Sequence, residues 1–256
     1  MPYPIPADFA ATGLFCAARG TKVARFQVIG ERSSGTNFVK RILGRNLPLA
    51  ATEALGWKHG HAQMLQVPSD LVVVIAVRRA DDWARSMFAK PWHSRPEMQR
   101  LAFPEFIRAP WDTIIDRPRY FDMHLAGPEP GQPLQQDRDP VTGRRYPNLF
   151  ALRRGKLASH LGFLNRDCNV CLLRMETAIA DPQGLLTAFR AAFGLPAPDA
   201  ALRPVLKRLG ARFQPAVEAR PPLPETLSPD DLAFLRAECD QDLEARLGYR
   251  YPASAA

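Results

Sequence analysis

The stretch from Phe26 to Phe38 constrains the fold more than any other part of the chain. Its sequence is Phe-Gln-Val-Ile-Gly-Glu-Arg-Ser-Ser-Gly-Thr-Asn-Phe. A short apolar segment typical of a strand leads into a loop between Gly30 and Gly35, and a helix is expected to begin near Thr36. Backbone N–H groups in such a loop converge on one point, and the helix N-terminus adds partial positive charge. The stretch therefore predicts a site for a phosphate or sulfate group.

The loop has the glycine spacing of a P-loop but lacks its lysine. In a P-loop the residue after the second glycine is Lys, whereas this chain has Thr36 after Gly35. A magnesium-dependent NTPase also usually places an aspartate at a strand end to hold its metal. Here the apolar run Leu71–Val77 ends in Arg78, which has the opposite charge. These differences favour a phosphate site without metal, and a P-loop kinase that uses ATP and Mg²⁺ is the main alternative.

The charge balance indicates an anionic ligand. The chain has 256 residues and a net charge of +8, carried mainly by arginine. Because the arginines are scattered and form no run of five or more, a cleft for a small polyanion is favoured over nucleic-acid binding. The third interpretation is that the many arginines only reflect a bias in the amino-acid composition. We expect no nucleic-acid partner.

Cysteine use and hydropathy predict a cytoplasmic protein. Cys168 and Cys171 form a C-x-x-C, but no second pair accompanies them, so buried thiols are favoured over a metal or redox site. Few cysteines without a regular framework suit a reducing compartment. The N-terminus lacks the pattern of a secretory signal, and the longest apolar run, Leu71–Val77, is too short to span a bilayer. We therefore expect no integral membrane segment.

Predicted strands and helices alternate, which indicates an α/β fold with a mostly parallel sheet in one domain, 1–256. Residues 1–20 are expected to form an irregular lead-in. Strands are expected at Arg25–Ile29, Leu71–Val77 and Val170–Arg174, a strand or turn at Leu55–Lys58, and helices at Gly35–Arg45, Asp81–Lys90, Asn148–Leu164, Pro182–Phe193 and from Ser228 to Leu247.

Two regions depart from this regular pattern. Residues 91–147 are rich in proline and aromatic residues and predict a long, loop-rich insertion, which is a candidate lid over an acceptor substrate. A mobile surface excursion is the alternative interpretation. Residues 197–256 are expected to form a basic, proline-rich loop followed by the last helix.

Polar residues follow three predicted strands. Ligands of open α/β sheets bind beyond the carboxyl ends of the strands. The first strand ends at the Gly30–Thr36 loop, the second at the sequence Lys58-His-Gly-His61, and the third at Arg78. An arginine at a strand end and Ser86 in the following helix can bind one phosphate from two sides. The alternative is that Arg78 and Ser86 are simply solvated.

With these motifs the chain resembles the sulfotransferases that use 3′-phosphoadenosine 5′-phosphosulfate (PAPS) as donor. The sequence Gly30-Glu-Arg-Ser-Ser-Gly-Thr-Asn37 is similar to the family's 5′-phosphosulfate loop. The segment from Arg78 to Ser86 is similar to its R-x-P-x-D-x₃-S pattern for the 3′-phosphate, with Ala80 in place of proline. Leu172-Leu-Arg-Met-Glu-Thr-Ala-Ile-Ala-Asp-Pro182 and Phe193-Gly-Leu-Pro196 resemble two later family segments.

The resemblance implies a P-loop NTPase-like, three-layer α/β/α fold and a donor site without metal. The implied PAPS-binding residues are Arg32, Ser33, Ser34, Gly35, Thr36, Asn37, Arg78 and Ser86. Family members usually carry a Lys or Arg two residues before the second loop glycine, a position that is Ser33 here. Either Arg32 or Lys58 is expected to supply that charge.

The implied reaction is in-line transfer of a sulfuryl group to a hydroxyl or amine. Lys58-His-Gly-His61 resembles a K-x-H motif of some members, so His59 or His61 is expected to take the acceptor proton. Charge stabilisation by Arg32 and Lys58 is expected to matter more than covalent chemistry. The acceptor is open between a carbohydrate, an anionic metabolite and a lipid headgroup, and a non-catalytic anion-binding module is a further alternative.

Overall fold

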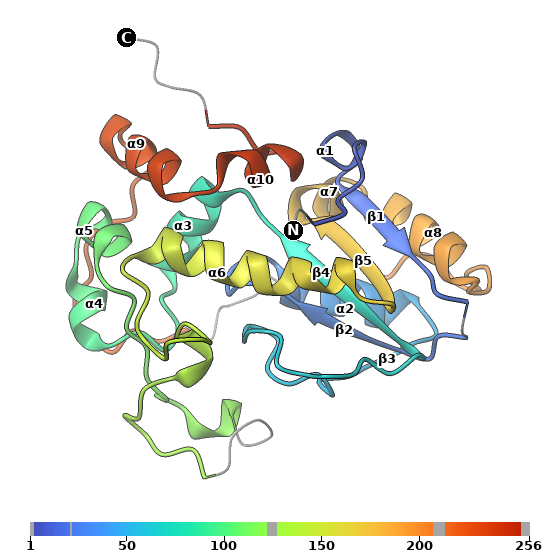
Figure 1. Cartoon of the computed structure of the whole chain (residues 1–256), viewed down its shortest axis with the longest axis horizontal. Helices are drawn as coiled ribbons and strands as arrows, with labels where there is room; N and C mark the ends of the chain where they lie inside the picture. Colours follow the sequence, from blue (N-terminus) through green and yellow to red (C-terminus); the bar gives the residue numbers. More distant parts are fainter. Residues whose placement is uncertain (1–2, 21, 122–126, 207–212, 252–256) are drawn as a thin grey trace.

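The protein is an α/β protein built on one mixed, mostly parallel sheet (Figure 1). A computed structural model describes residues 3–20, 22–121, 127–206 and 213–251. Within these residues the sheet has five strands in the order β1-β5-β4-β2-β3. Their bounds are β1 (Leu14–Ala17), β2 (Arg25–Ile29), β3 (Ala50–Ala51), β4 (Leu71–Val77) and β5 (Asn169–Arg174).

Helices connect most of the strands, one helix precedes β1, and the remaining helices follow β5. The α-helices are α1 (Phe9–Thr12), α2 (Thr36–Asn46), α3 (Ala80–Ala89), α4 (Pro96–Arg100), α5 (Phe103–Arg108), α6 (Leu149–Leu161), α7 (Met175–Ala180), α8 (Pro182–Phe193), α9 (Pro229–Glu238) and α10 (Gln241–Arg246). Short 3₁₀ turns are found at η1 (Pro118–Tyr120), η2 (Gln135–Asp137) and η3 (Gly162–Asn165). Within the described ranges, no helix combines the length and the apolar character needed to cross a membrane.

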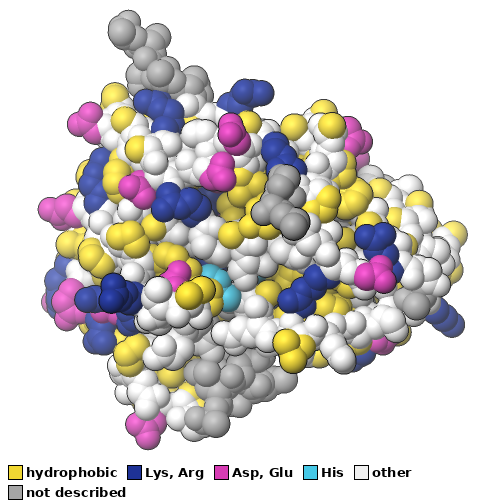
Figure 2. Space-filling model, in the orientation of Figure 1, with side chains coloured by type: hydrophobic (Ala, Val, Ile, Leu, Met, Phe, Trp, Pro, Cys, Tyr) yellow, Lys and Arg dark blue, Asp and Glu magenta, His cyan; other side chains and the backbone are white. Residues whose placement is uncertain are grey.

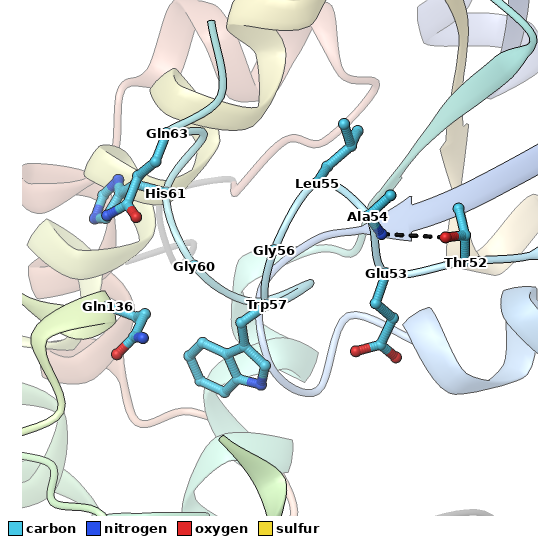
Figure 3. Close-up of a pocket in the computed structure, with 10 residues that line it drawn as sticks. All are labelled: Thr52, Glu53, Ala54, Leu55, Gly56, Trp57, Gly60, His61, Gln63 and Gln136. Carbon is cyan, nitrogen blue, oxygen red and sulfur yellow. Dashed lines mark hydrogen bonds between the residues drawn. The ribbon is translucent and has the colours of Figure 1, made fainter. Parts of the chain in front are cut away.

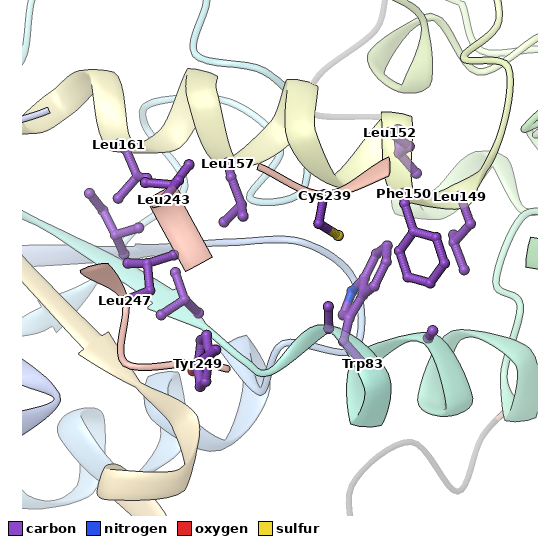
Figure 4. Close-up of a cluster of buried hydrophobic side chains, with 14 of the residues drawn as sticks. Trp83, Leu149, Phe150, Leu152, Leu157, Leu161, Cys239, Leu243, Leu247 and Tyr249 are labelled. Atoms are coloured by element: carbon purple, nitrogen blue, oxygen red, sulfur yellow. The ribbon is translucent and has the colours of Figure 1, made fainter. Parts of the chain in front are cut away.

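Helices cover both faces of the sheet because its central strand is apolar on both sides. All of β4 is buried, and it pairs in parallel with β2 and β5. Val72 and Val74 pack in a cluster with α2 and α8, whereas Val73 and Ile75 pack in another with α3, α5 and α6 (Figure 4). Alternate residues of a strand point to opposite faces, so one continuous apolar run supplies both cores.

Several predicted boundaries are confirmed. The strands at Arg25–Ile29 and Leu71–Val77 and the helix at Pro182–Phe193 have the predicted limits. Asp181 caps this helix by accepting a hydrogen bond from the Gly184 N–H at 2.8 Å, and Gly194 ends it in the left-handed conformation, with φ of 60°. The two ends of this helix are therefore set by local capping residues.

The prediction of an irregular lead-in over residues 1–20 was wrong. This segment contains α1 and β1, and β1 pairs antiparallel with β5 at the edge of the sheet. The pairing places Cys16 opposite Cys171, far along the chain. A four-residue edge strand carries no clear alternation of its own, so its partner decides its structure.

Leu55–Lys58 was predicted as a strand or a turn and is a turn, and the strand that pairs with β2 is the two-residue β3. The prediction of one last helix from Ser228 to Leu247 needs correction. The last predicted helix is broken at Cys239, and Asp240 caps a separate helix, α10, through the Leu243 N–H at 3.0 Å. The apolar period continues across the break, which hid the second cap from a search for periodicity.

The insertion at 91–147 is loop-rich, as predicted, and has a small core of its own. It contains α4, α5, η1 and η2, together with isolated β-bridges. Ile115, Phe121 and Leu134 form a cluster that packs against Trp57. Residues 122–126 of the insertion and 207–212 and 252–256 of the C-terminal region lie outside the described residues.

Candidate functional site

The connections that follow β2 and β4 diverge at the carboxyl ends of these two strands. From β2 the chain passes through α2 to β3 on one side, and then returns to form β4 on the other side of β2. Helix α2 packs on one face of the sheet, and α3, which follows β4, packs on the opposite face. Ligands of open α/β sheets bind where the connections diverge in this way. The glycine loop and Arg78 follow these two strands.

The geometry of the glycine loop requires its glycines. A Cβ on Gly30 would lie 2.5 Å from the carbonyl oxygen of Ala76 in β4. Gly35 has φ of 90°, and a Cβ there would lie 2.2 Å from the sulfur of Met175. Ser33 also adopts a positive φ, 63°, which is uncommon for a residue with a side chain. The loop is therefore a tight turn pressed against the ends of β4 and β5.

This loop leaves several backbone donors free. The N–H groups of Ser33, Gly35, Thr36 and Asn37 donate to no other group in the described ranges. The Ser34 hydroxyl, in contrast, donates to the Glu31 carbonyl at 2.7 Å and closes the turn. Free donors at the N-terminus of a helix suit an anion, because the helix dipole adds positive charge there.

Arg78 lies against this loop. Its Nη1 donates to the Ser33 carbonyl at 3.1 Å, so the guanidinium from the end of β4 reaches the turn after β2. Ser86 lies farther along α3, and its hydroxyl has no hydrogen-bond partner among the described residues. The structure thus brings Arg78 and the loop together, and among the described residues no hydrogen bond joins Ser86 to either.

Lys58 supplies a cation at the start of α2. Its carbonyl accepts a hydrogen bond from the Gly30 N–H at 3.0 Å, and its Nζ donates to Asn37 Oδ1 at 2.6 Å. Burial lowers the pKa of Lys58 to about 8, partly offset by Glu53. The residue is therefore held beside the free loop donors by both its backbone and its side chain, and it lies at the end of the turn at Leu55–Lys58.

His59 contacts the same loop and is neutral. Its Nδ1 lies 2.7 Å from the Gly30 carbonyl oxygen. Because a carbonyl can only accept, we assign the proton to Nδ1, which leaves the Nε2 lone pair available. Burial, and then the charge of Lys58, hold the pKa of His59 well below its usual value. At neutral pH the ring is therefore uncharged, with a free lone pair on Nε2.

His61 lies elsewhere. It is buried, and its Nε2 is 3.3 Å from the hydroxyl of Tyr146, with the two rings stacked. Burial, and then Lys156, lower the pKa of His61 to about 4. Of the two candidate histidines, His59 is the one that hydrogen-bonds to the glycine loop.

Arg32 points into the protein. Its guanidinium pairs with Asp137 of the insertion and lies over the rings of Trp57 and Trp111, at 5.7 and 5.6 Å from their centroids. Its side chain is 5% exposed. Of the two residues proposed as the loop cation, Lys58 is the one beside the free loop donors.

A buried charge network beneath the loop was missed by the sequence analysis. Arg153 of α6 pairs with Glu31 of the loop at 2.8 Å and with Glu244 of α10 at 2.7 Å. It also donates to the Arg78 carbonyl at 2.8 Å. Burial and the Glu244 charge raise the pKa of Glu31 to about 7, against the lowering effect of Arg153.

A second buried cation lies next to it on α6. Lys156 donates to the His59 carbonyl at 2.8 Å and lies 3.3 Å from Asp137. Burial lowers the pKa of Lys156 to about 8, although Asp137 opposes the shift. Positions 153, 156 and 160 share one face of a helix, so the polar stripe Arg153, Lys156 and His160 was the available signal.

Two neighbouring side chains support this arrangement. Glu176 accepts hydrogen bonds from the Arg79 N–H at 3.0 Å and the Tyr249 hydroxyl at 2.9 Å, and so braces the end of β4. Trp83 is fully buried, and its Nε1 donates to the Arg32 carbonyl at 2.8 Å. Among the described side chains, no group of three or more His, Cys, Asp or Glu is placed to hold a metal ion.

A cavity of about 480 Å³ opens beside the site (Figure 3). It is formed mainly by the two arms of the loop after β3, and Gln136 of the insertion contributes from the opposite side. The lining residues are Thr52, Glu53, Ala54, Leu55, Gly56, Trp57, Gly60, His61, Gln63 and Gln136. Lys58 and His59, which contact the glycine loop, lie between these arms in sequence.

Comparison with known proteins gives no relative of this chain. No family model matches it, and neither does any curated protein or solved structure. The function must therefore be argued from the chemistry of the site.

Proposed function

We propose that the protein is a sulfotransferase that moves a sulfuryl group from PAPS to an acceptor hydroxyl. The contact between Arg78 and the Ser33 carbonyl, at 3.1 Å, carries the proposal. It joins two anion-binding elements that lie far apart in the sequence, as a nucleotide with phosphates at two positions requires. A fold of the P-loop NTPase type belongs to the same proposal, since it rests on a strand, a glycine loop and a helix at a point where connections diverge.

The residues fit the donor in number and kind. The free N–H groups of Ser33, Gly35, Thr36 and Asn37 suit the 5′-phosphosulfate, because nothing else in the described chain uses them. The guanidinium of Arg78 and the free hydroxyl of Ser86 suit the 3′-phosphate. PAPS, when bound, supplies an activated sulfuryl group, and Lys58 provides positive charge for the phosphate that leaves.

His59 is the proposed proton acceptor. Its Nδ1–H is engaged by Gly30, and its Nε2 has no hydrogen-bond partner in the described chain. The acceptor hydroxyl oxygen forms the new bond to sulfur, the bond between sulfur and the bridging phosphate oxygen breaks, and the hydroxyl proton moves to Nε2. His59→Gln should lower the rate by about 10²–10⁴, a typical range for general-base catalysis.

The test is a thermal-shift and calorimetric titration with 3′,5′-adenosine bisphosphate in the absence of metal. We expect stabilisation of the wild type and a loss of affinity of about 10–100-fold for Arg78→Ala, because charge-assisted hydrogen bonds contribute about 1.5–3 kcal/mol. Arg79→Ala is the matched control. Its guanidinium pairs with Asp81 at 2.8 Å, so binding should be unchanged.

Parallel titrations separate the alternatives. Stabilisation by ATP and Mg²⁺ alone would favour a kinase, and stabilisation by short oligonucleotides alone would favour nucleic-acid binding. On the face shown in Figure 2, Lys and Arg side chains are dispersed among acidic and apolar ones. Binding of the bisphosphate without transfer from PAPS to any acceptor would indicate a non-catalytic module. Equal binding by Arg78→Ala and wild type would refute the phosphate assignment.

A further inference from the structure

We propose that the cavity beside the glycine loop binds a neutral, polyhydroxylated acceptor of the saccharide class. This inference rests on the proposed function and narrows it, since the sequence left carbohydrate, anionic metabolite and lipid headgroup equally open. The cavity volume of about 480 Å³ lies within the roughly 300–1,000 Å³ typical of small-molecule sites.

The charge of the lining disfavours an anionic acceptor. None of the ten residues around the cavity is Lys or Arg. The carboxylate is that of Glu53, which pairs with Lys40 of α2 at 2.9 Å, and the histidine is His61, whose imidazole is neutral at pH 7. An anionic acceptor would find no cation in this lining, whereas a neutral ligand meets no such penalty.

The lining supplies an aromatic surface that is already fixed. The Trp57 indole has the Arg32 guanidinium over its ring and contacts Phe121 and His59 edge-on, with centroids 5.4 and 5.2 Å away. A ring held on several sides loses little entropy when a ligand packs on it. The C–H face of a sugar ring is apolar and suits such an indole surface.

Amide groups complete the match to hydroxyls. Gln63 and Gln136 both line the cavity, and Figure 3 shows the side chain of Gln136 on the side opposite the arm that bears Leu55. Gln136 is 8% exposed, and its Nε2 donates to no group among the described residues. A ligand hydroxyl in the cavity can accept a hydrogen bond from this amide N–H.

The position of the cavity links this acceptor to the donor site. Trp57 lines the cavity, and the next two residues, Lys58 and His59, hydrogen-bond to Asn37 and Gly30 of the glycine loop. A hydroxyl of a saccharide packed on Trp57 would therefore lie near the proposed proton acceptor. Gln136 comes from the insertion, which gives residues 91–147 a direct part in acceptor binding.

The test measures binding without any donor present. Saturation-transfer NMR and calorimetry are run with cellobiose, chitobiose and mannobiose, and with a glucuronate-containing disaccharide and 2-naphthol for comparison. We expect at least one neutral disaccharide to bind, with the indole contacting its ring protons, and the other two compounds not to bind. Trp57→Ala should weaken binding at least tenfold.

Two further variants make the result decisive. Gln63→Leu alters an exposed residue of the lining, so the variant should fold normally and bind the disaccharide about fivefold more weakly. Trp92→Ala is the control, because it removes an indole outside the cavity and should leave disaccharide affinity unchanged. Binding of only the uronate or naphthol, binding of none, or unchanged binding in both lining variants would overturn the inference. If 3′,5′-adenosine bisphosphate does not bind, in contrast, the proposed sulfotransferase function is refuted. The saccharide titrations then still decide whether the cavity binds a saccharide.

Discussion

The two faces of the sheet are packed by different means. The core under α2 and α8 is a cluster of buried apolar side chains that includes Ile42, Leu186 and Phe189. The core under α3 and α6 is also largely apolar, but charged side chains are buried next to it, among them Arg153, which is fully inaccessible to solvent. Hydrophobic burial alone is enough to hold a helix on a sheet, so the charges on the second face require another explanation.

That explanation lies in what Arg153 contacts. One guanidinium binds Glu31 of the glycine loop, the carbonyl of Arg78 at the end of β4, and Glu244 of α10. The two elements of the proposed phosphate site are therefore fixed from beneath by the same side chain. Apolar residues could fill this volume but could not set the positions of a loop carboxylate and a strand-end carbonyl. We interpret the charged face as the support of the site.

The largest predicted effect follows from removing this guanidinium. Arg153→Ala leaves Glu31 and Glu244 buried without their cation, and breaking a buried pair in this way costs about 3–5 kcal/mol. Because the loop loses its anchor, affinity for the bisphosphate should fall as well. Urea unfolding and calorimetry measure the two effects. A stable variant with normal bisphosphate affinity would contradict the supporting role of this face.

On the apolar face, the loss of stability should leave the site intact. Leu186 of α8 is 1% exposed, and Leu186→Ala should cost about 2–4 kcal/mol through lost burial and the cavity left behind. Bisphosphate affinity, measured by calorimetry at a temperature where the variant is folded, should match that of the wild type. The loss of stability should also be independent of pH between 5 and 8, since no charge is involved. A weakened phosphate site would show that the two faces are not separable.

The same contrast explains which parts of the fold could be predicted. The strand Leu71–Val77 is apolar on both faces, and the helix Pro182–Phe193 carries its own cap and stop, so local sequence was sufficient for both. Strand β1 and the break between α9 and α10 depend on distant partners, such as Cys171 opposite Cys16. Pairings between distant residues leave no periodic pattern in the local sequence, so they could not be predicted from it.

For the site, sequence reasoning placed the loop and Arg78 together, because topology brings strand ends to one edge. It could not choose between Arg32 and Lys58, since the choice depends on Asp137, which lies more than a hundred residues from Arg32 and binds it inside the protein. It also overlooked Arg153, because a basic residue in a helix is normally taken as solvent-facing.

The smallest predicted effect concerns Glu31 and has a defined dependence on pH. Two carboxylates, Glu31 and Glu244, face the one guanidinium of Arg153, and the pKa of Glu31 is raised to about 7 by burial and by Glu244. Between pH 4.5 and 7 the folded protein binds this proton more tightly than the unfolded chain, so the stability that it contributes is lost as pH rises through 7. Glu31→Gln has no such proton and leaves a matched ion pair. Its stability should equal that of the wild type near pH 5 and exceed it by about 2 kcal/mol at pH 8, as measured by urea unfolding at both values. A variant that is less stable than the wild type at pH 8 would contradict this. It would mean that Arg153 offsets the cost of burying the Glu31 charge, and that this ion pair stabilises the fold in addition to positioning the loop.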